Sequence, residues 1–470
     1  MRFEVNPSFD QNKVFIENWS EISGKRFDPF FNKPELRKLD DKVRLKTQWR
    51  MRNLIIKMSS GSTPSKSDKD SYYTSSFQGV PFLRVTNITE YGINWDDMVF
   101  INQETHDGLL ARSQVYENDL LVTITGRIAS SCTAPKDFVG NINQHSVVIK
   151  TRSEVISKQI ACFLNSDIGQ TIAFRYTTGG TRPALDFSSI RNLPIILSEK
   201  IVNIMENAYK LKSEKEELSK DLFNRIDSIL FEQLGIELLD KEKANIQNRI
   251  FETKWNQLAG QRWDPFFHRP YIASLLSLLN PVSIKLNDIC DFSNELWDQK
   301  SIFQNSFSYI EIGAIDIKNG RITEISEIEI GKAPSRARMI ARDGDILVSL
   351  TRPSRGAITY LITDKIMIAS TGFAIIRNLK KNISKKYLYY VLRSKLSLLQ
   401  MEQRSSGGNY PAITQQELGQ ILIPIVEKEK QDDIVKHIDM IYKETEQLNT
   451  EANEIIIHAK QEVGKIILEG

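Results

Sequence analysis

The stretch GKRFDPFFNKP at residues 24–34 occurs again, slightly altered, as GQRWDPFFHRP at residues 260–270. The two copies share Gly, Arg, Asp, Pro, two Phe and a final Pro at identical spacing, and an aromatic residue, Phe27 or Trp263, precedes each Asp. A sequence echo at a fixed separation indicates a duplicated unit. Because the separation is 236 residues (260 minus 24) in a chain of 470, the unit is a whole domain and not a short solenoid repeat.

The repeat extends well beyond this segment. Four further pairs of stretches correspond: GVPFLRVTNITEYG (79–92) with SFSYIEIGAIDIKNG (306–320), YENDLLVTITG (116–126) with RDGDILVSLTR (342–352), NQHSVVIK (143–150) with ASTGFAIIR (369–377), and TTGGTRPALDFSSIRNLPIIL (177–197) with SSGGNYPAITQQELGQILIPI (405–425). The offset is 226 from Asp119 to Asp345 and 228 from Gly179 to Gly407. Such a small drift is expected where surface loops accept insertions.

Within each copy, alternating apolar runs bounded by Gly, Asn and Asp predict short strands. Residues 153–176 and 383–402 place apolar residues three and four apart and predict helices. The fold class is therefore α+β, with two pseudo-repeated mixed domains and two long helices that form an antiparallel coiled coil. The expected boundaries are 1–40 for an N-terminal anchor, 41–198 for the first domain, 199–248 for a central helix, 249–280 for the repeated anchor, 281–426 for the second domain and 427–470 for a C-terminal helix.

The long helices are predicted from apolar residues at strict 3–4 spacing, flanked by Glu and Lys, which is typical of a coiled-coil seam. The expected seam residues are Ile204, Leu211, Leu218 and Leu222 in the first helix and Ile438, Ile441, Leu448 and Ile456 in the second. A seam this long favours a partner helix, and the other copy in the same chain is the nearest one. The alternative is a surface helix that lies on its own domain.

Composition excludes several classes of protein. Hydrophobic residues make up 41% and charged residues 26%, as in ordinary globular domains, and the net charge is only +3. No apolar run reaches membrane-spanning length, and the first 15 residues contain no apolar signal core, so we expect a cytoplasmic protein. The three cysteines, Cys132, Cys162 and Cys290, are far apart and are expected to be buried and reduced.

Catalytic signatures are missing from the sequence. It contains no P-loop, no GxGxxG after a strand and no Asn-Pro-Pro-aromatic motif of amino-methyltransferases, and its five histidines lack metal-ligand spacing. EIEIGK at 327–332 is only a faint echo of a nuclease strand, because no suitable Asp precedes it. We therefore predict no catalytic residue, no metal and no cofactor of its own.

Basic charge is concentrated locally in both halves. Residues 41–70 hold eight Lys or Arg against three Asp, and residues 332–355 hold six against two. Such clusters in loops can contact phosphate, although most charge runs are simply solvated. Two glycine-containing loops, TTGGTRP (177–183) and RSSGGNYP (404–411), bring backbone N–H groups and an Arg together, but the same glycines also suit a turn into a helix capped by Asp186, Ser188 or Thr414. The repeated Arg-aromatic-Asp-Pro-Phe-Phe segment is interpreted mainly as an anchor between each domain and its long helix.

In these stretches, with GSTPSKSD (61–68) and LVTITGRIASSCTAP (121–135), the chain resembles the specificity subunits of type I restriction–modification systems. The resemblance covers nearly the whole chain and rests on the order of weak motifs, their duplication and the paired helices. GSTPSKSD has no clear counterpart in the second half, where DFSNELWDQK (291–300) stands instead. In that family each domain reads one half of a split DNA site and the two helices act as a ruler. A helix of about 40 residues spans roughly 60 Å, which is one to two turns of DNA.

The resemblance implies double-stranded DNA as ligand and two DNA methyltransferase subunits as partners, with motor–nuclease subunits joining for cleavage. S-adenosylmethionine would be used by the methyltransferase subunit. The expected DNA contacts in the first half are Lys66, Arg84, Asn87, Arg127, Gln144, Thr178, Gly179, Gly180, Thr181 and Arg182. In the second half they are Arg336, Arg338, Arg352, Arg355, Arg404, Ser406, Gly407, Gly408, Asn409 and Tyr410. The alternatives are a recognition subunit of another methylation-linked phage-defence system and a coiled-coil adaptor that does not bind DNA.

Overall fold

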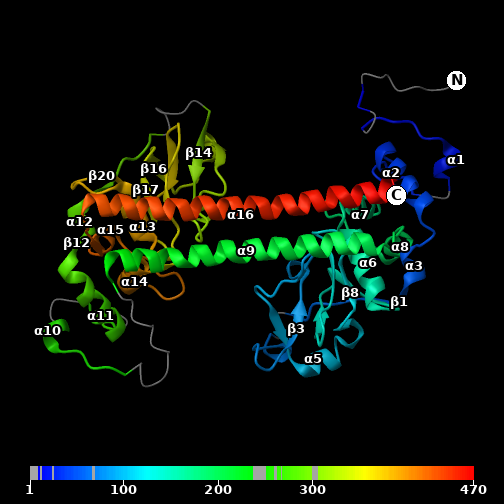
Figure 1. Ribbon diagram of the computed structural model, residues 1–470, viewed down its shortest axis with the longest axis horizontal. Helices are drawn as coiled ribbons and strands as arrows, with labels where there is room; N and C mark the ends of the chain where they lie inside the picture. The colour runs from blue at the N-terminus through cyan, green and yellow to red at the C-terminus, as the bar shows by residue number, and fades with distance from the viewer. Residues whose placement is uncertain are drawn as a thin grey trace. The chain divides into compact units, whose positions relative to one another are not determined.

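The structure, a computed structural model, describes residues 9–10, 13–23, 26–65, 69–236, 250–258, 262–265, 267–298 and 305–469. The chain divides into two compact units, unit 1 with residues 1–216 and 449–470, and unit 2 with residues 217–448. Two long helices, α9 (Glu199–Leu234) and α16 (Lys428–Glu469), contribute one part to each unit (Figure 1). The predicted central helix reached residue 248, but α9 ends at Leu234, and Gly235 follows it with a φ of 65°.

The long helices run antiparallel within each unit. In unit 1, Lys215 of α9 forms an ion pair with Glu451 of α16 at 2.5 Å, and Met205 shares a buried core with Ile456 and Val463. In unit 2, the rings of Phe223 and Tyr442 lie 5.1 Å apart, and Leu230 shares a core with Ile434 and Ile438. Residue numbers rise along α9 as they fall along α16, as the sequence predicted.

The seam of α9 differs from the predicted one by one residue over two turns. Leu211 and Leu218 are 39% and 49% exposed, so their assignment to the seam is wrong, and Lys212 and Ser219 are buried instead. Lys212 is accommodated because its ammonium pairs with Glu216 and lies over the Tyr91 ring, 4.8 Å from its centroid. In α16 the predicted seam residues Ile438, Ile441 and Ile456 are buried and Leu448 is half-buried.

Unit 1 contains two main sheets. Its strands are β1 Ile55–Ser60, β2 Tyr73–Thr74, β3 Val80–Leu83, β4 Ile88–Thr89, β5 Gly92–Ile93, β6 Val99–Ile101, β7 Gln114–Tyr116, β8 Leu120–Thr123, β9 Ser131–Thr133, β10 Val139–Ile142 and β11 Ser146–Thr151. One sheet has the order β1-β11-β8-β9 and is antiparallel throughout, and the other has the order β2-β6-β3-β10-β7 with β3 and β10 parallel. Strand β8 (LLVT) is buried along its whole length, which explains its continuous apolar sequence.

Unit 2 repeats the strand order of both main sheets, apart from the edge strand β2, which has no counterpart among its described strands. Its strands are β12 Ser283–Lys285, β13 Cys290–Ser293, β14 Ser306–Ile310, β15 Ser326–Glu329, β16 Ala337–Ala341, β17 Ile346–Ser349, β18 Ile358–Tyr360, β19 Met367–Ser370, β20 Phe373–Leu379 and β21 Leu422–Pro424. The order β13-β20-β17-β18 matches β1-β11-β8-β9, and β15-β14-β19-β16 matches β6-β3-β10-β7, including the parallel pair β14–β19. The duplicated domain predicted from sequence is therefore a duplicated fold.

The shorter helices also repeat. In unit 1 they are α1 Trp19–Ile22, α2 Pro34–Lys46, α3 Met51–Leu54, α4 Lys69–Tyr72, α5 Gln103–Asp107, α6 Glu154–Asn165, α7 Asp167–Arg175 and α8 Phe187–Asn192; in unit 2 they are α10 Trp255–Leu258, α11 Pro270–Leu279, α12 Leu286–Ile289, α13 Lys385–Arg393, α14 Lys395–Arg404 and α15 Gln415–Leu418. Each predicted long helical stretch is two helices, broken at Ser166 and Ser394, whose hydroxyls donate to the carbonyls of Phe163 and Val391. As the sequence suggested, Asp186 and Thr414 cap the helices that follow the glycine loops.

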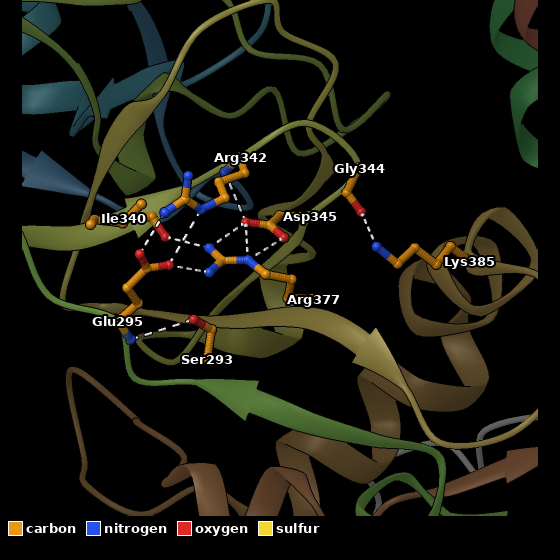
Figure 2. Close-up of polar contacts among 8 residues, drawn as sticks. All are labelled: Ser293, Glu295, Ile340, Arg342, Gly344, Asp345, Arg377 and Lys385. Carbon is orange, nitrogen blue, oxygen red and sulfur yellow. Dashed lines mark hydrogen bonds and ion pairs between the residues drawn. The ribbon is translucent and has the colours of Figure 1, made fainter.

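A buried Asp explains the repeated turn before strands β8 and β17. Asp119 accepts the Tyr116 backbone N–H at 2.8 Å and pairs with Lys150, and Asp345 accepts the Arg342 backbone N–H at 2.8 Å and pairs with Arg377. Figure 2 shows the larger network of unit 2, in which Arg377 lies between Asp345 and Glu295. Asp345 has no exposed surface, so this paired Arg compensates a charge that would otherwise be costly to bury.

Candidate nucleic-acid interface

Backbone hydrogen bonds join the loops that follow β8, β10 and α7 in unit 1. The Ile124 N–H donates to His145 O and the Leu185 N–H donates to Ile124 O, both at 2.9 Å. Thr178 and Ala184 exchange two backbone hydrogen bonds at 2.8 and 2.9 Å, which closes the neck of the glycine loop. We call residues 84–87, 124–130, 143–145 and 177–185 loop cluster 1.

Side chains extend these connections within loop cluster 1. Arg127 donates from Nη2 to Val85 O at 2.9 Å, and the Thr125 hydroxyl lies 2.9 Å from His145 Nδ1. Thr63, from the loop after β1, hydrogen-bonds Gln144. The loops are therefore one connected surface to which the sequence contributes polar and basic side chains from five separate places.

The tip of the glycine loop is open to solvent. Thr178, Gly179, Gly180, Thr181 and Arg182 are all exposed. Gly179 has a φ of 92°, and a Cβ there would lie 2.9 Å from Arg182 O, so only glycine fits this turn without strain. Among the described residues, the Arg182 guanidinium has no hydrogen-bond or ion-pair partner, so it is free to contact a ligand.

Unit 2 builds the same connections from matching residues. The Leu350 N–H donates to Gly372 O at 2.8 Å, the Ile413 N–H donates to Leu350 O at 2.9 Å, and Ser406 and Ala412 exchange two hydrogen bonds of 2.8 Å. Thr371 N–H donates to Arg336 O at 2.9 Å, which ties β16 to this surface. We call residues 311–314, 336–338, 350–356, 370–372 and 406–413 loop cluster 2.

Matched positions of the two clusters carry different side chains. Thr125 and Thr351 both bridge to the alanine of the loop neck, so Gly126 corresponds to Arg352. Arg352 adopts the left-handed conformation of Gly126, with a φ of 48° against 73°. Its Nη2 donates to Asn409 O at 3.0 Å, and its guanidinium carbon lies 4.2 Å from the Tyr410 ring centroid.

The counterpart of Arg182 is Tyr410 and not Arg404. A Cβ on Gly179 would contact Arg182 O, and a Cβ on Gly407 would contact Tyr410 O in the same way. The Arg404 side chain is 17% exposed and pairs with Glu417 at 2.8 Å, so the prediction that Arg404 contacts DNA is wrong. The sequence misled here because only an Arg near each glycine pair was compared, without the hydrogen bonds that fix the alignment.

The structure brings most of the other predicted contacts together. Arg127 and Gln144 lie in loop cluster 1 with the glycine loop, and Arg336, Arg338, Arg352 and Arg355 lie in loop cluster 2 with Ser406, Gly407, Gly408, Asn409 and Tyr410. Arg84 is half-buried and donates to Asp97 O. Lys66 lies outside the described residues.

Asn87 has a structural role, and its prediction as a DNA contact is wrong. It is fully buried, accepts the Arg84 N–H at 3.0 Å and donates to Asn94 O and Asp96 O. Its side chain therefore closes the 3-10 turn at 85–87. Sequence reasoning missed Thr63 and His145, which hydrogen-bond Gln144 and Thr125 within loop cluster 1.

Other kinds of site find little support in the described part of the chain. Its His, Cys, Asp and Glu side chains form no group of three that could hold a metal ion. Burial raises the pKa of the Cys132, Cys162 and Cys290 thiols to about 12, so none of the three is a reactive thiolate near neutral pH. No described helix is long and apolar enough to cross a membrane. The two basic loop clusters remain as the candidate site.

Comparison with known proteins gives a family match over one part of the chain. The family model of the type I restriction modification DNA specificity domain matches residues 281–456, which include loop cluster 2. The type I restriction enzyme HindI specificity subunit of Haemophilus influenzae is 26% identical over 155 residues, or 32% of this chain and 33% of that protein. The matched part is thus one third of the length of this curated relative.

Solved structures give weaker likenesses over longer stretches. The specificity subunit of a type I system from M. genitalium is 15% identical with a TM-score of 0.38, covering 88% of this chain and 94% of that chain. A chain from a structural study of type I complex assembly and conformational transition is 16% identical with a TM-score of 0.44, covering 90% and 96%. The matches to known proteins therefore show a type I restriction modification DNA specificity domain over residues 281–456, and unit 1 repeats the strand order of that domain.

Proposed function

We propose that this chain is the DNA-sequence-specificity subunit of a type I restriction–modification complex. Each loop cluster reads one half of a bipartite site in double-stranded DNA. The observation that carries the proposal is that one connected loop framework occurs twice while the exposed side chains on it differ. A repeated framework suits one way of docking on the double helix, and different side chains suit two different half-site sequences.

The side chains have the chemistry that base and phosphate contacts need. An exposed Arg such as Arg182 can donate two hydrogen bonds to guanine O6 and N7. Exposed Arg336, Arg338 and Arg355 can contact phosphate, and Tyr410 offers an aromatic face beside Arg352. The proposed contacts are Arg84, Arg127, Gln144, Thr178, Gly179, Gly180, Thr181 and Arg182 in unit 1 and Arg336, Arg338, Arg352, Arg355, Ser406, Gly407, Gly408, Asn409 and Tyr410 in unit 2.

The chain acts through partners in this proposal. Two methyltransferase subunits dock on it in the cytoplasm and transfer the methyl group from S-adenosylmethionine, and motor–nuclease subunits join for cleavage. The chain itself contributes recognition and holds no cofactor. By binding particular DNA sequences, it decides where the methyltransferase subunits act.

Reconstitution tests this function. The isolated chain should methylate no DNA, and adding the cognate methyltransferase subunit and S-adenosylmethionine should give methylation at one bipartite sequence. Methylome sequencing of a host that carries the system identifies that sequence. Methyl transfer by the isolated chain, or site choice that stays the same when the loop clusters are replaced, would contradict the proposal.

A further inference from the structure

The repeated Arg-aromatic-Asp-Pro-Phe-Phe segment holds an Arg in a fixed orientation. In unit 1, Asp28 Oδ2 accepts from Arg26 Nε at 2.8 Å, and Asp28 Oδ1 accepts the Phe31 N–H at 2.9 Å. The Phe31 ring centroid lies 4.8 Å from the Arg26 guanidinium carbon. Asn32 donates to Arg26 O at 2.9 Å, which fixes the backbone at the same place. These contacts with Asp28, Phe31 and Asn32 fix the orientation of the Arg26 guanidinium, so that its two terminal nitrogens point the same way.

Those two nitrogens bind the start of the glycine loop. Arg26 Nη1 donates to Tyr176 O at 3.0 Å, and Nη2 donates to Thr177 O at 2.7 Å. Helix α7 ends at Arg175, and Thr178 begins the loop whose tip carries Arg182. The last carbonyls of a helix lack partners inside it and favour a nearby cation. Arg26 thus fixes the two residues through which the chain leaves the helix and enters the loop.

Unit 2 repeats each of these contacts. Arg262 Nε donates to Asp264 Oδ2 at 2.9 Å, and Asp264 Oδ1 accepts the Phe267 N–H at 3.0 Å. Arg262 Nη1 donates to Arg404 O at 2.7 Å and Nη2 to Ser405 O at 3.1 Å. His268 replaces Asn32 and hydrogen-bonds Arg262 O. We expected an anchor to the long helices, but these hydrogen bonds run to the loop entrance of the segment's own domain.

A second connection accompanies the first in both units. Arg175 Nε donates to Phe31 O at 2.8 Å, and Gln403 Nε2 donates to Phe267 O at 2.7 Å. The last turn of the helix and the segment therefore hold each other at two points. With the Thr178–Ala184 pair closing the neck of the loop, only the exposed tip is left without backbone support.

We propose that Arg26 and Arg262 are positioning residues for DNA recognition, each fixing the reading loop of its own half-site. The proposal rests on the proposed function. A planar guanidinium spans two consecutive carbonyls, whereas the single ammonium of Lys cannot reproduce both bonds in a fixed geometry. Loosening the loop entrance should misplace Arg182 or Tyr410 against the bases without removing any group that touches DNA.

The test compares Arg26→Lys and Arg262→Lys, with Lys33→Ala as a control for changing another basic residue of the same segment. The Lys33 ammonium lies 5.3 Å from the Phe30 ring centroid, and among the described residues it forms no hydrogen bond with Tyr176 or Thr177. Full-length chain, assembled with its methyltransferase subunit, is bound to duplexes randomised in either half-site. The readout is the ratio of Kd values for altered and cognate half-sites.

Arg26→Lys should lower discrimination at the first half-site about ten-fold, which is within the range for one lost bidentate base contact, and leave the second unchanged. Arg262→Lys should do the reverse, and Lys33→Ala should change neither. Equal loss at both half-sites, or no loss at either, overturns the positioning role. If Arg182→Ala relaxes the first half-site while Arg26→Lys does not, only the positioning role fails. If the unaltered chain shows no discrimination at all, the proposed function fails as well.

Discussion

The guanidinium of Arg352 lies over the ring of Tyr410, with its central carbon 4.2 Å from the ring centroid, and donates to Asn409 O at 3.0 Å. The Arg352 N–H also donates to Pro411 O at 2.7 Å. The loop after β17 and the glycine loop therefore share one surface in unit 2. Tyr410 is 71% exposed, so it is accessible to a ligand.

We expect Tyr410→Ala to weaken binding at the second half-site about two- to five-fold. The substitution removes the cation–π contact that holds Arg352, and an exposed contact of this kind contributes about 0.5–1 kcal/mol. Tyr410→Phe keeps the ring and should stay close to the original affinity. Competition binding with duplexes altered in each half-site measures the effect. If Tyr410→Phe lost as much affinity as Tyr410→Ala, the hydroxyl, and not the ring, would make the contact.

Arg182→Ala should affect the first half-site only. If Arg182 contacts a base edge, the loss is about 1–3 kcal/mol and preference relaxes at that base; if it contacts phosphate, all sequences weaken evenly and the salt slope falls by about one. Binding to a library randomised in both half-sites, at several salt concentrations, separates the two cases. A change of base preference in the half-site contacted by residues 281–426 would show that Arg182 is assigned to the wrong half-site.

Arg404→Ala should reduce stability and leave base preference intact. The half-buried side chain pairs with Glu417 at 2.8 Å, and its guanidinium carbon lies 5.6 Å from the Phe267 ring centroid. A hydrogen bond to a charged group contributes about 1.5–3 kcal/mol, so we expect a loss near 2 kcal/mol. Lys428→Ala breaks an exposed pair with Asp432 and should cost about 0.5 kcal/mol in the same thermal unfolding experiment. Altered half-site preference in Arg404→Ala would restore it as a DNA contact.

The Glu295 carboxylate should make stability depend on pH. Its pKa lies below the ordinary value of 4.5, chiefly because Arg342 donates a hydrogen bond to it. A depressed pKa contributes stability that is present above the unfolded pKa and is lost as pH falls through the folded pKa. The stability difference between the original chain and Glu295→Gln should therefore shrink as pH falls below about 4.5. Urea midpoints from pH 6 to pH 3 measure it; a difference that stays constant contradicts the interpretation.

The burial of residues along the two long helices predicts which substitutions destabilise the protein. Ile438 is fully buried between the helices, so Ile438→Ala should cost about 2–5 kcal/mol. Leu211→Ala should cost less than about 1 kcal/mol, because Leu211 is 39% exposed. Urea unfolding of the two variants distinguishes the observed seam from the one predicted by apolar spacing. Equal losses would mean that Leu211 is buried by a partner in solution.

The sequence by itself determined the duplication, the α+β class and the places of the two long helices. These features are written in local patterns, since alternation predicts strands, 3–4 spacing predicts helices, and an echoed segment predicts a second copy of the same fold. It also placed Arg127, Gln144 and the glycine loops among the candidate contacts. Turn chemistry was readable too, because Asp186 and Thr414 cap helices as their positions suggested.

Only the tertiary structure decided which of these residues lie together and which already have partners within the protein. Lys212 is buried in place of Leu211 because its ammonium pairs with Glu216 and lies over the ring of Tyr91, and the spacing of apolar residues does not predict those contacts. The sequence suggested Arg404 and Asn87 as DNA contacts. In the structure, however, the Arg404 guanidinium pairs with Glu417, and the Asn87 amide donates to the carbonyls of Asn94 and Asp96. Long-range hydrogen bonds such as those from Arg26 to residues 176 and 177 depend on how the chain folds back on itself, and local sequence carries no record of that geometry.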